Sequence, residues 1–174
     1  MMAAVKSECQ GIESVSVSVN NDIYDFDIGR MYLICNPRSD RAFSIARDFL
    51  SSGHTILCVS RYHPDIVRDM CNSREFRSVW LSDRRRDDSI SANQLPRLKM
   101  RISSFLKSRE GRVIVLDGIE YLSLSNDFPK LLRFVEELND IVMELRAILL
   151  IPVDPRSFDR RSLARLRRFA EVVH

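Results

Sequence analysis

The sequence predicts a three-layer α/β/α domain whose central β-sheet is mainly parallel. Short segments such as MYLIC and VIVLD are apolar throughout, as strands are when both faces of their sheet are covered. Between these segments, apolar residues recur at helical spacing. Repeated units of strand, helix and strand connect through right-handed crossovers, which place helices on both faces of the sheet. With 174 residues, the chain is long enough for one such domain.

The first 28 residues are expected to precede this repeat. Residues 1–12 show no consistent period and are predicted to form a loose N-terminal segment. From Glu13, polar and apolar residues alternate, Asn20 and Asn21 supply a turn, and the alternation then resumes. This pattern is typical of a β-hairpin. We therefore expect a single domain over 13–174, with an edge hairpin over 13–28 and an α/β core over 29–174.

Strands and helices are expected to alternate along the core. The buried strands are predicted at residues 31–35, 55–60, 79–81, 113–117 and 147–153. The helices are predicted over residues 40–52, from Pro64 with Ile66, Val67 and Met70 inward, from about Pro96 to Gly111, from Pro129, and from Ser157 to Val173. The segment DRRRDDS, before the third helix, is interpreted as a charged, flexible loop.

Composition excludes several classes of protein. With 45% hydrophobic and 29% charged residues, the chain resembles an ordinary globular protein rather than a disordered one. Its four cysteines are widely spaced without a CxxC pair, so neither a zinc site nor a disulfide framework is expected. No apolar run approaches the roughly 20 residues of a membrane span. We expect a cytoplasmic protein without a metal or cofactor.

The loop after the first core strand decides against ordinary nucleotide hydrolysis. In P-loop NTPases this position holds GxxxxGK[S/T], whose glycine amides and lysine bind the phosphates. Here residues 36–41 contain neither glycine nor lysine, Pro37 removes an amide donor, and Asp40 adds a negative charge. Arg38 and Arg41 could still attract an anion at the helix amino terminus.

The fourth core strand ends in a carboxylate, as the Walker B strand of an NTPase does. Four apolar residues lead into Asp117, and Glu120 follows three residues later. Such a pair could bind a metal ion or activate water. The alternative is structural: Asp117 caps the following turn, and Glu120 accepts hydrogen bonds from neighbouring loops. Both interpretations remain open on the sequence alone.

Nucleophilic catalysis is not expected from the remaining loops. His63 follows the second core strand without a partner nucleophile, Cys58 lies within a buried strand, and Ser60 lacks a glycine-framed elbow. We therefore predict no catalytic residue.

The C-terminal arginines are the remaining charged feature. Arg161, Arg165 and Arg168 are spaced by four and three residues, which places them on one face of the predicted last helix. This face could meet nucleic acid, an acidic protein or anionic lipid, or it could simply be solvated.

Several segments, taken in order, resemble the archaeal proteins of domain of unknown function 835. The matching segments are GRMYLIC, SSGHTILCVSRYHPDIVRD, VWLS, VIVLDGIEYL with the following NDF, and IPVDP. The resemblance runs from about Gly29 to Val173. It implies a RecA-like and KaiC-like layout without a functional phosphate loop, in a non-hydrolytic relative of those ATPases that often accompanies signalling or membrane segments.

The resemblance carries no established catalytic residues, but it points to one surface. By matching position, the candidates are Arg61, Pro64, Asp117, Glu120, Tyr121 and Asp154, which follow the strand ends and are called the strand-end rim below. Our leading hypothesis is a non-enzymatic regulatory or signalling module that binds a protein partner or a small ligand at this rim. The alternatives are an atypical nucleotide-binding protein and nucleic-acid binding through the C-terminal arginines. Self-association is a further possibility.

Overall fold

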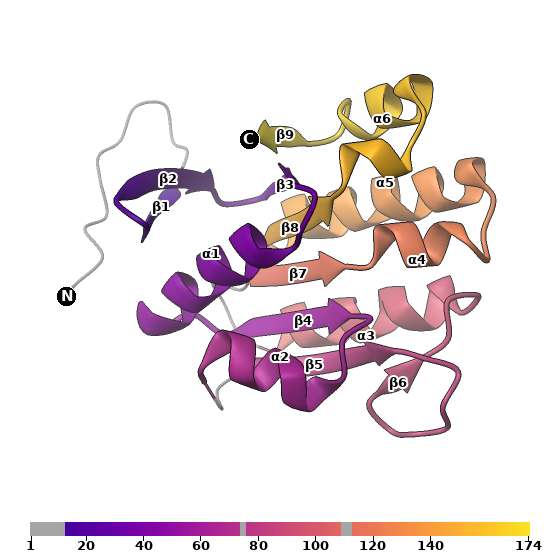
Figure 1. Cartoon of the computed structure of the whole chain (residues 1–174), viewed down its shortest axis with the longest axis horizontal. Coiled ribbons are helices and arrows are strands. Elements are labelled where there is room, and N and C mark those ends of the chain that lie inside the picture. Colours follow the sequence, from indigo (N-terminus) through magenta and orange to yellow (C-terminus); the bar gives the residue numbers. More distant parts are fainter. Residues whose placement is uncertain (1–12, 74–75, 109–112) are drawn as a thin grey trace.

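The protein is a three-layer α/β/α domain with an additional hairpin (Figure 1), here in a computed structural model that describes residues 13–73, 76–108 and 113–174. Seven strands form one sheet in the order β6-β5-β4-β7-β8-β3-β9, and its pairings are parallel. These strands are β3 Arg30–Cys35, β4 Ile56–Ser60, β5 Phe76–Leu81, β6 Ser89–Ile90, β7 Val113–Asp117, β8 Ile148–Val153 and β9 Glu171–Val173. The predicted mainly parallel sheet is confirmed.

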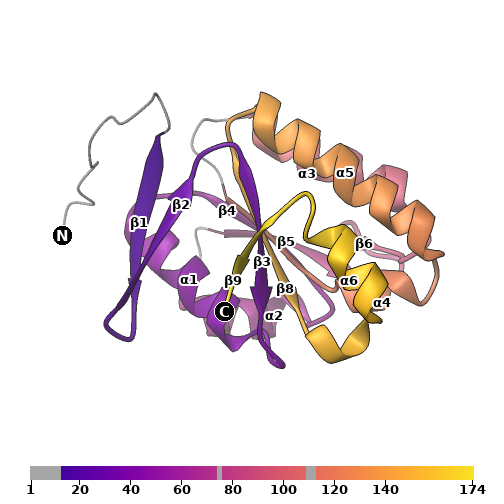
Figure 2. The same ribbon diagram turned by 90° about the horizontal axis from the view of Figure 1, so that it is seen from above.

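The helices divide between the two faces of this sheet (Figure 2). Helices α1 (Asp40–Ser51) and α2 (Pro64–Cys71) cover one face. The other face is covered by α3 (Leu95–Lys107), α4 (Ile119–Ser123), α5 (Phe128–Glu144) and α6 (Arg160–Leu166). A 3₁₀ turn, η1 (Pro155–Ser157), precedes α6. Successive residues of each buried strand enter opposite cores, which explains why these strands are apolar throughout.

The predicted hairpin is confirmed, and it forms a separate sheet. Strands β1 (Ser14–Val19) and β2 (Asp22–Asp27) pair antiparallel and do not join the large sheet. Asn20 and Asn21 both have positive φ, of 51° and 69°, as the favoured two-residue hairpin turn requires. The hairpin packs beside α1 and contributes Val17 and Phe26 to the core on that face.

The end of the chain differs from the prediction. Helix α6 ends at Leu166 rather than continuing to Val173, and a turn closed by the Phe169 N–H bond to the Leu166 carbonyl follows it. Residues 171–173 then form β9 beside β3. Pairing with the open edge of β3 satisfies backbone groups that a longer helix would have left unpaired on that strand.

Other differences are local. Ile66 is exposed, whereas the inward residues of α2 are Val67 and Cys71, with Met70 partly buried. Strand β6 and helix α4 were not predicted, because segments of two and five residues are too short to show a period. The predicted helix end at Gly111 lies outside the described residues. Within the described part of the chain, no helix combines the length and apolarity of a membrane span.

Candidate functional site

Asp117 is the centre of the strand-end rim. Strands β4 and β7 are neighbours and their last residues, Ser60 and Asp117, are paired in register. The Ser60 hydroxyl donates to Asp117 Oδ2 at 2.8 Å, and the Ser39 hydroxyl donates to Oδ1 at 2.6 Å. Asp117 is only 8% exposed. Three strand ends, those of β3, β4 and β7, thus supply the groups around one buried carboxyl.

Ser39 reaches Asp117 because of its place in the chain. It stands at the start of α1, just after the loop that follows β3, where a serine usually caps the helix. Its side chain makes no such cap and bonds to Asp117 instead. The amide of Arg38 is turned toward the Asn36 side chain at 3.1 Å. Within the described residues, neither Arg38 nor Arg41 is drawn into the hydrogen bonds around Asp117.

Glu120 connects Asp117 to the end of β8. Its Oε1 accepts a hydrogen bond of 2.8 Å from the backbone N–H of Asp154. Asp154 in turn caps the η1 turn and pairs with Arg156 at 2.8 Å. Burial raises the pKa of Glu120, and the nearby charges of Asp117 and Asp154 add to this shift. The hydrogen bonds correspond to the structural interpretation of Glu120, an acceptor for a neighbouring loop.

The pKa of Asp117 is also raised by burial, while the hydrogen bonds from Ser39 and Ser60 oppose the shift. A carboxyl whose pKa is higher in the folded state binds more protons there, so its ionisation weakens folding as pH rises. As pH rises from 3.8, the ordinary pKa of an aspartate carboxyl, to neutral pH, we expect the free energy of unfolding to fall less in an Asp117→Asn variant than in the wild type. Urea denaturation across that range measures the difference, and an unchanged pH slope would contradict it.

Arg61 and Tyr121 lie against each other at the same edge. The Arg61 guanidinium is centred 4.7 Å from the Tyr121 ring, and it donates to the Leu81 carbonyl at 2.7 Å. The indole N–H of Trp80 donates back to the Arg61 carbonyl at 3.2 Å. Pro64 begins α2 in the first turn, where its missing N–H costs nothing. The rim residues named from sequence therefore follow neighbouring strand ends, and Pro64 has a helix-starting role.

The C-terminal arginines do not share one helix face. Arg161 and Arg165 lie on α6, but Arg168 lies in the turn beyond its end. Arg168 lines a cavity of about 550 Å³ beside the first residues of β3 and the end of α5. This cavity lies at the amino-terminal edge of the sheet, opposite the rim. The predicted three-arginine face is wrong because the helix stops before Arg168.

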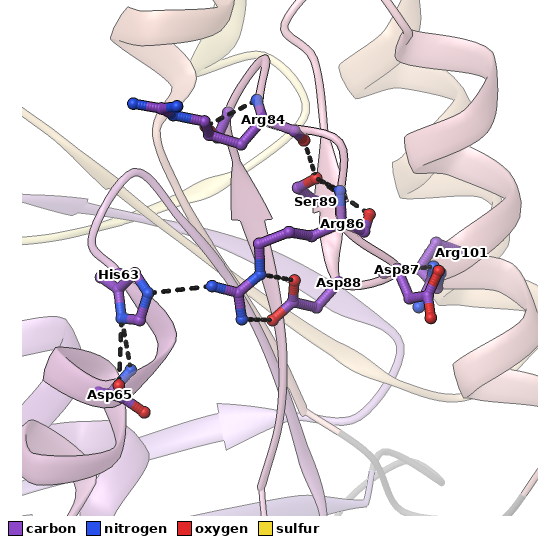
Figure 3. Close-up of polar contacts among 9 residues, drawn as sticks. His63, Asp65, Arg84, Arg86, Asp87, Asp88, Ser89 and Arg101 are labelled. Atoms are coloured by element: carbon purple, nitrogen blue, oxygen red, sulfur yellow. Dashed lines mark hydrogen bonds and ion pairs between the residues drawn. The ribbon is translucent and has the colours of Figure 1, made fainter.

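The segment interpreted as a flexible loop is instead tied down by side chains (Figure 3). Arg86 makes a two-pronged pair with Asp88, at 2.9 and 3.0 Å, and lies over the Trp80 ring at 5.6 Å. Its third nitrogen is 3.2 Å from His63 Nε2. His63 also stands edge-on to Trp80, with ring centroids 5.0 Å apart. The spacing of Arg86 and Asp88 is visible in the sequence, whereas the contact of Arg86 with His63, the residue before α2, is not.

A comparison with models of protein families places most of the chain in one family. The model of a family described as "Protein of unknown function (DUF835)" matches residues 35–169, well over half of the chain. No curated protein matches. The matched range includes Ser39, Ser60, Asp117, Glu120 and Asp154, and it excludes the hairpin and β9. The chain therefore belongs to the DUF835 family of proteins of unknown function.

Proposed function

We propose that this protein is a non-enzymatic regulatory or signalling module that keeps a RecA-like layout and binds a protein partner at the strand-end rim. The hydrogen bond between Ser39 and Asp117 carries the proposal. In P-loop NTPases a serine or threonine of the phosphate loop and the Walker B aspartate hold Mg²⁺ together. Here a serine after β3 is hydrogen-bonded to the aspartate that ends β7. This supports the RecA-like and KaiC-like layout that the resemblance to the archaeal proteins of domain of unknown function 835 implies.

The same contact favours binding over hydrolysis. Both oxygens of Asp117 accept hydrogen bonds from serine hydroxyls. The raised pKa of Asp117 reflects a buried environment that disfavours the charged form. The loop before Ser39 contains no lysine to neutralise a γ-phosphate. Asp117 is then a structural link between three strand ends, and it holds the rim in one conformation.

The rim presents side chains suited to a protein partner. Tyr62, which follows β4, is 45% exposed, and Leu124, which ends α4, is 81% exposed. Both segments leave the edge of the sheet toward which the β4 and β7 arrows point (Figure 1). The stacked pair of Arg61 and Tyr121 belongs to the same two segments. Tyrosine and arginine are enriched among the residues that dominate binding energy at protein interfaces.

Affinity purification from the native cell, with quantitative mass spectrometry, tests this proposal. A Tyr62→Ala, Leu124→Ala double variant is expected to retain partners at about one tenth of the wild-type level or less, because each truncation at an interface centre costs about 1–2 kcal/mol. The control is Ile23→Ala, which removes an exposed apolar side chain from the hairpin, away from the rim. Equal recovery of every partner by the rim variant and the wild type would reject a rim interface.

A second measurement addresses catalysis directly. Purified protein is expected to release no phosphate from ATP or GTP in the presence of Mg²⁺. Turnover that Asp117→Ala abolishes would overturn the non-enzymatic assignment in favour of an atypical nucleotide-hydrolysing protein. Turnover that survives this substitution would indicate a contaminating enzyme, and repurification should then remove it.

A further inference from the structure

A basic hollow of about 460 Å³ lies beside the strand-end rim, where β5 ends and α3 begins. We call it the arginine hollow. Its lining carries four arginines against two aspartates, together with serine and glutamine side chains: Arg84, Arg85, Arg86, Arg97, Asp83, Asp87, Ser82, Ser89, Ser91 and Gln94. It adjoins the rim because Arg61 bonds to the carbonyl of Leu81, the residue before Ser82.

The loop that forms the hollow is fixed before any ligand arrives. Ser89 is 3% exposed, and its hydroxyl accepts the Arg86 N–H at 3.1 Å and contacts the Arg84 carbonyl. The amide of Arg84 bonds to the Ser82 hydroxyl at 3.2 Å. From α3, Arg101 donates to the Asp87 carbonyl at 2.9 Å. A rigid loop loses little backbone conformational entropy when it binds, so the backbone that carries these arginines is preorganised for a ligand.

The arginines of the hollow have different roles. Arg86 is engaged by Asp88 and His63 (Figure 3). It also lies over the Trp80 ring, so it holds the loop in place. Within the described residues, the guanidinium groups of Arg84, Arg85 and Arg97 have no hydrogen-bond or ion-pair partner. In Figure 3 the Arg84 side chain points away from the Arg86 and Asp88 pair. Unpaired guanidinium groups of residues that line one concavity attract anions, and each can bind two carboxylate or phosphate oxygens at once.

The amino terminus of α3 adds to this positive field. Gln94 and Arg97, from the start of this 13-residue helix, both line the hollow. Gln94 uses its side-chain oxygen on the Ser91 N–H at 3.2 Å and does not cap the helix, and the first turn contains no acidic residue. No acidic side chain of the helix's own first turn therefore offsets the partial positive charge of the helix end.

We propose that the arginine hollow binds the phosphoryl groups of a small anionic ligand. The hollow lies next to the rim through the hydrogen bond from Arg61 to the Leu81 carbonyl, but its ligand binding is a separate property from the proposed partner interface. Its volume falls within the roughly 300–1,000 Å³ of small-ligand sites. Single-stranded nucleic acid fits less well, because it needs an aromatic face for stacking, and the Trp80 ring is already contacted by Arg86 and His63.

Isothermal titration of the full chain with inorganic tripolyphosphate, ATP and GTP tests the inference. We expect binding that weakens as salt is raised, and a loss of at least about tenfold in affinity in an Arg84→Ala, Arg85→Ala variant and in Arg97→Ala. Arg165→Ala, which removes an arginine from α6, is the matched control and should bind like the wild type. The contacts of Arg84 that hold the loop use its backbone, and within the described residues the guanidinium groups of Arg84, Arg85 and Arg97 make no hydrogen bond or ion pair, so the alanine variants should melt at the wild-type temperature.

The relative affinities of the probes identify which chemical group the hollow recognises. Equal affinity for tripolyphosphate and ATP assigns recognition to the phosphates alone, whereas tighter binding of ATP or GTP assigns it to a nucleotide. No binding of any phosphoryl probe at millimolar concentration, or equal binding by wild type and arginine variants, overturns the inference. Tighter binding of a polyglutamate peptide than of tripolyphosphate overturns it in favour of an acidic protein segment. If partner capture fails while tripolyphosphate still binds, only the proposed rim interface is rejected.

Discussion

Replacing Phe26 by alanine is expected to lower the free energy of unfolding by about 3–5 kcal/mol. Phe26 is fully buried where the hairpin meets the domain. Its ring contacts Tyr32 of β3 edge-on, with centroids 4.8 Å apart, and Phe49 of α1 at 5.6 Å. The substitution removes the aromatic link between hairpin, helix and sheet, and the surrounding groups cannot fill the space completely.

The control for Phe26→Ala lies in the same strand. Ile23 is 73% exposed, so Ile23→Ala should change stability by no more than about 0.5 kcal/mol. Urea denaturation followed by circular dichroism measures both variants. A loss below about 1 kcal/mol for Phe26→Ala would mean that the hairpin contributes little to the domain, contrary to its place in the core.

Replacing Gly118 by alanine is expected to cost about 2–4 kcal/mol, from backbone strain and overpacking together. Gly118 has a φ of 148°, which L residues rarely adopt, and an added Cβ would lie 2.6 Å from Cδ1 of Leu81. Leu81 is fully buried and has little room to move. Gly118 also carries the chain from Asp117 to Glu120, so its strain would be transmitted to both carboxyls.

Gly53→Ala separates the two contributions. Gly53 also has a positive φ, of 86°, but an added Cβ would meet nothing within 4 Å. Its substitution should therefore cost only about 1–2 kcal/mol of backbone strain. In Gly118→Ala, a second substitution of Leu81→Val removes the clashing atom and should recover part of the loss. Equal costs at the two glycines would show that the contact with Leu81 is unimportant.

The parts of the fold that the sequence predicted depend on local patterns. The strands around Leu33, Val59 and Leu116 are apolar at every position because two cores cover them, and this is visible in any window of five residues. The hairpin was equally clear, since its alternation and its two asparagines specify the turn. The placement of Asp117 at a shared edge followed from parallel strands ending together.

What the sequence missed depends on contacts between distant segments. The sequence of residues 171–173 alone fits a helix end as well as a strand. Their strand structure depends on pairing with the open edge of β3. The link from Ser39 to Asp117 spans 78 residues, and its geometry depends on sheet order. The charged loop is ordered by Ser89, His63 and Trp80, which a count of its charges does not include. Local composition alone therefore predicted flexibility where tertiary contacts impose order.

The two outer strands of the large sheet bear on where one copy of this protein could pair with another. Strand β6 has two residues and β9 has three, although the strands between them are long and apolar. Short outer strands leave little unpaired backbone against which another chain could add a strand. In the described residues the hairpin presents longer edges, of six residues each. Strand exchange or aggregation between copies should therefore begin at the hairpin rather than at the central sheet.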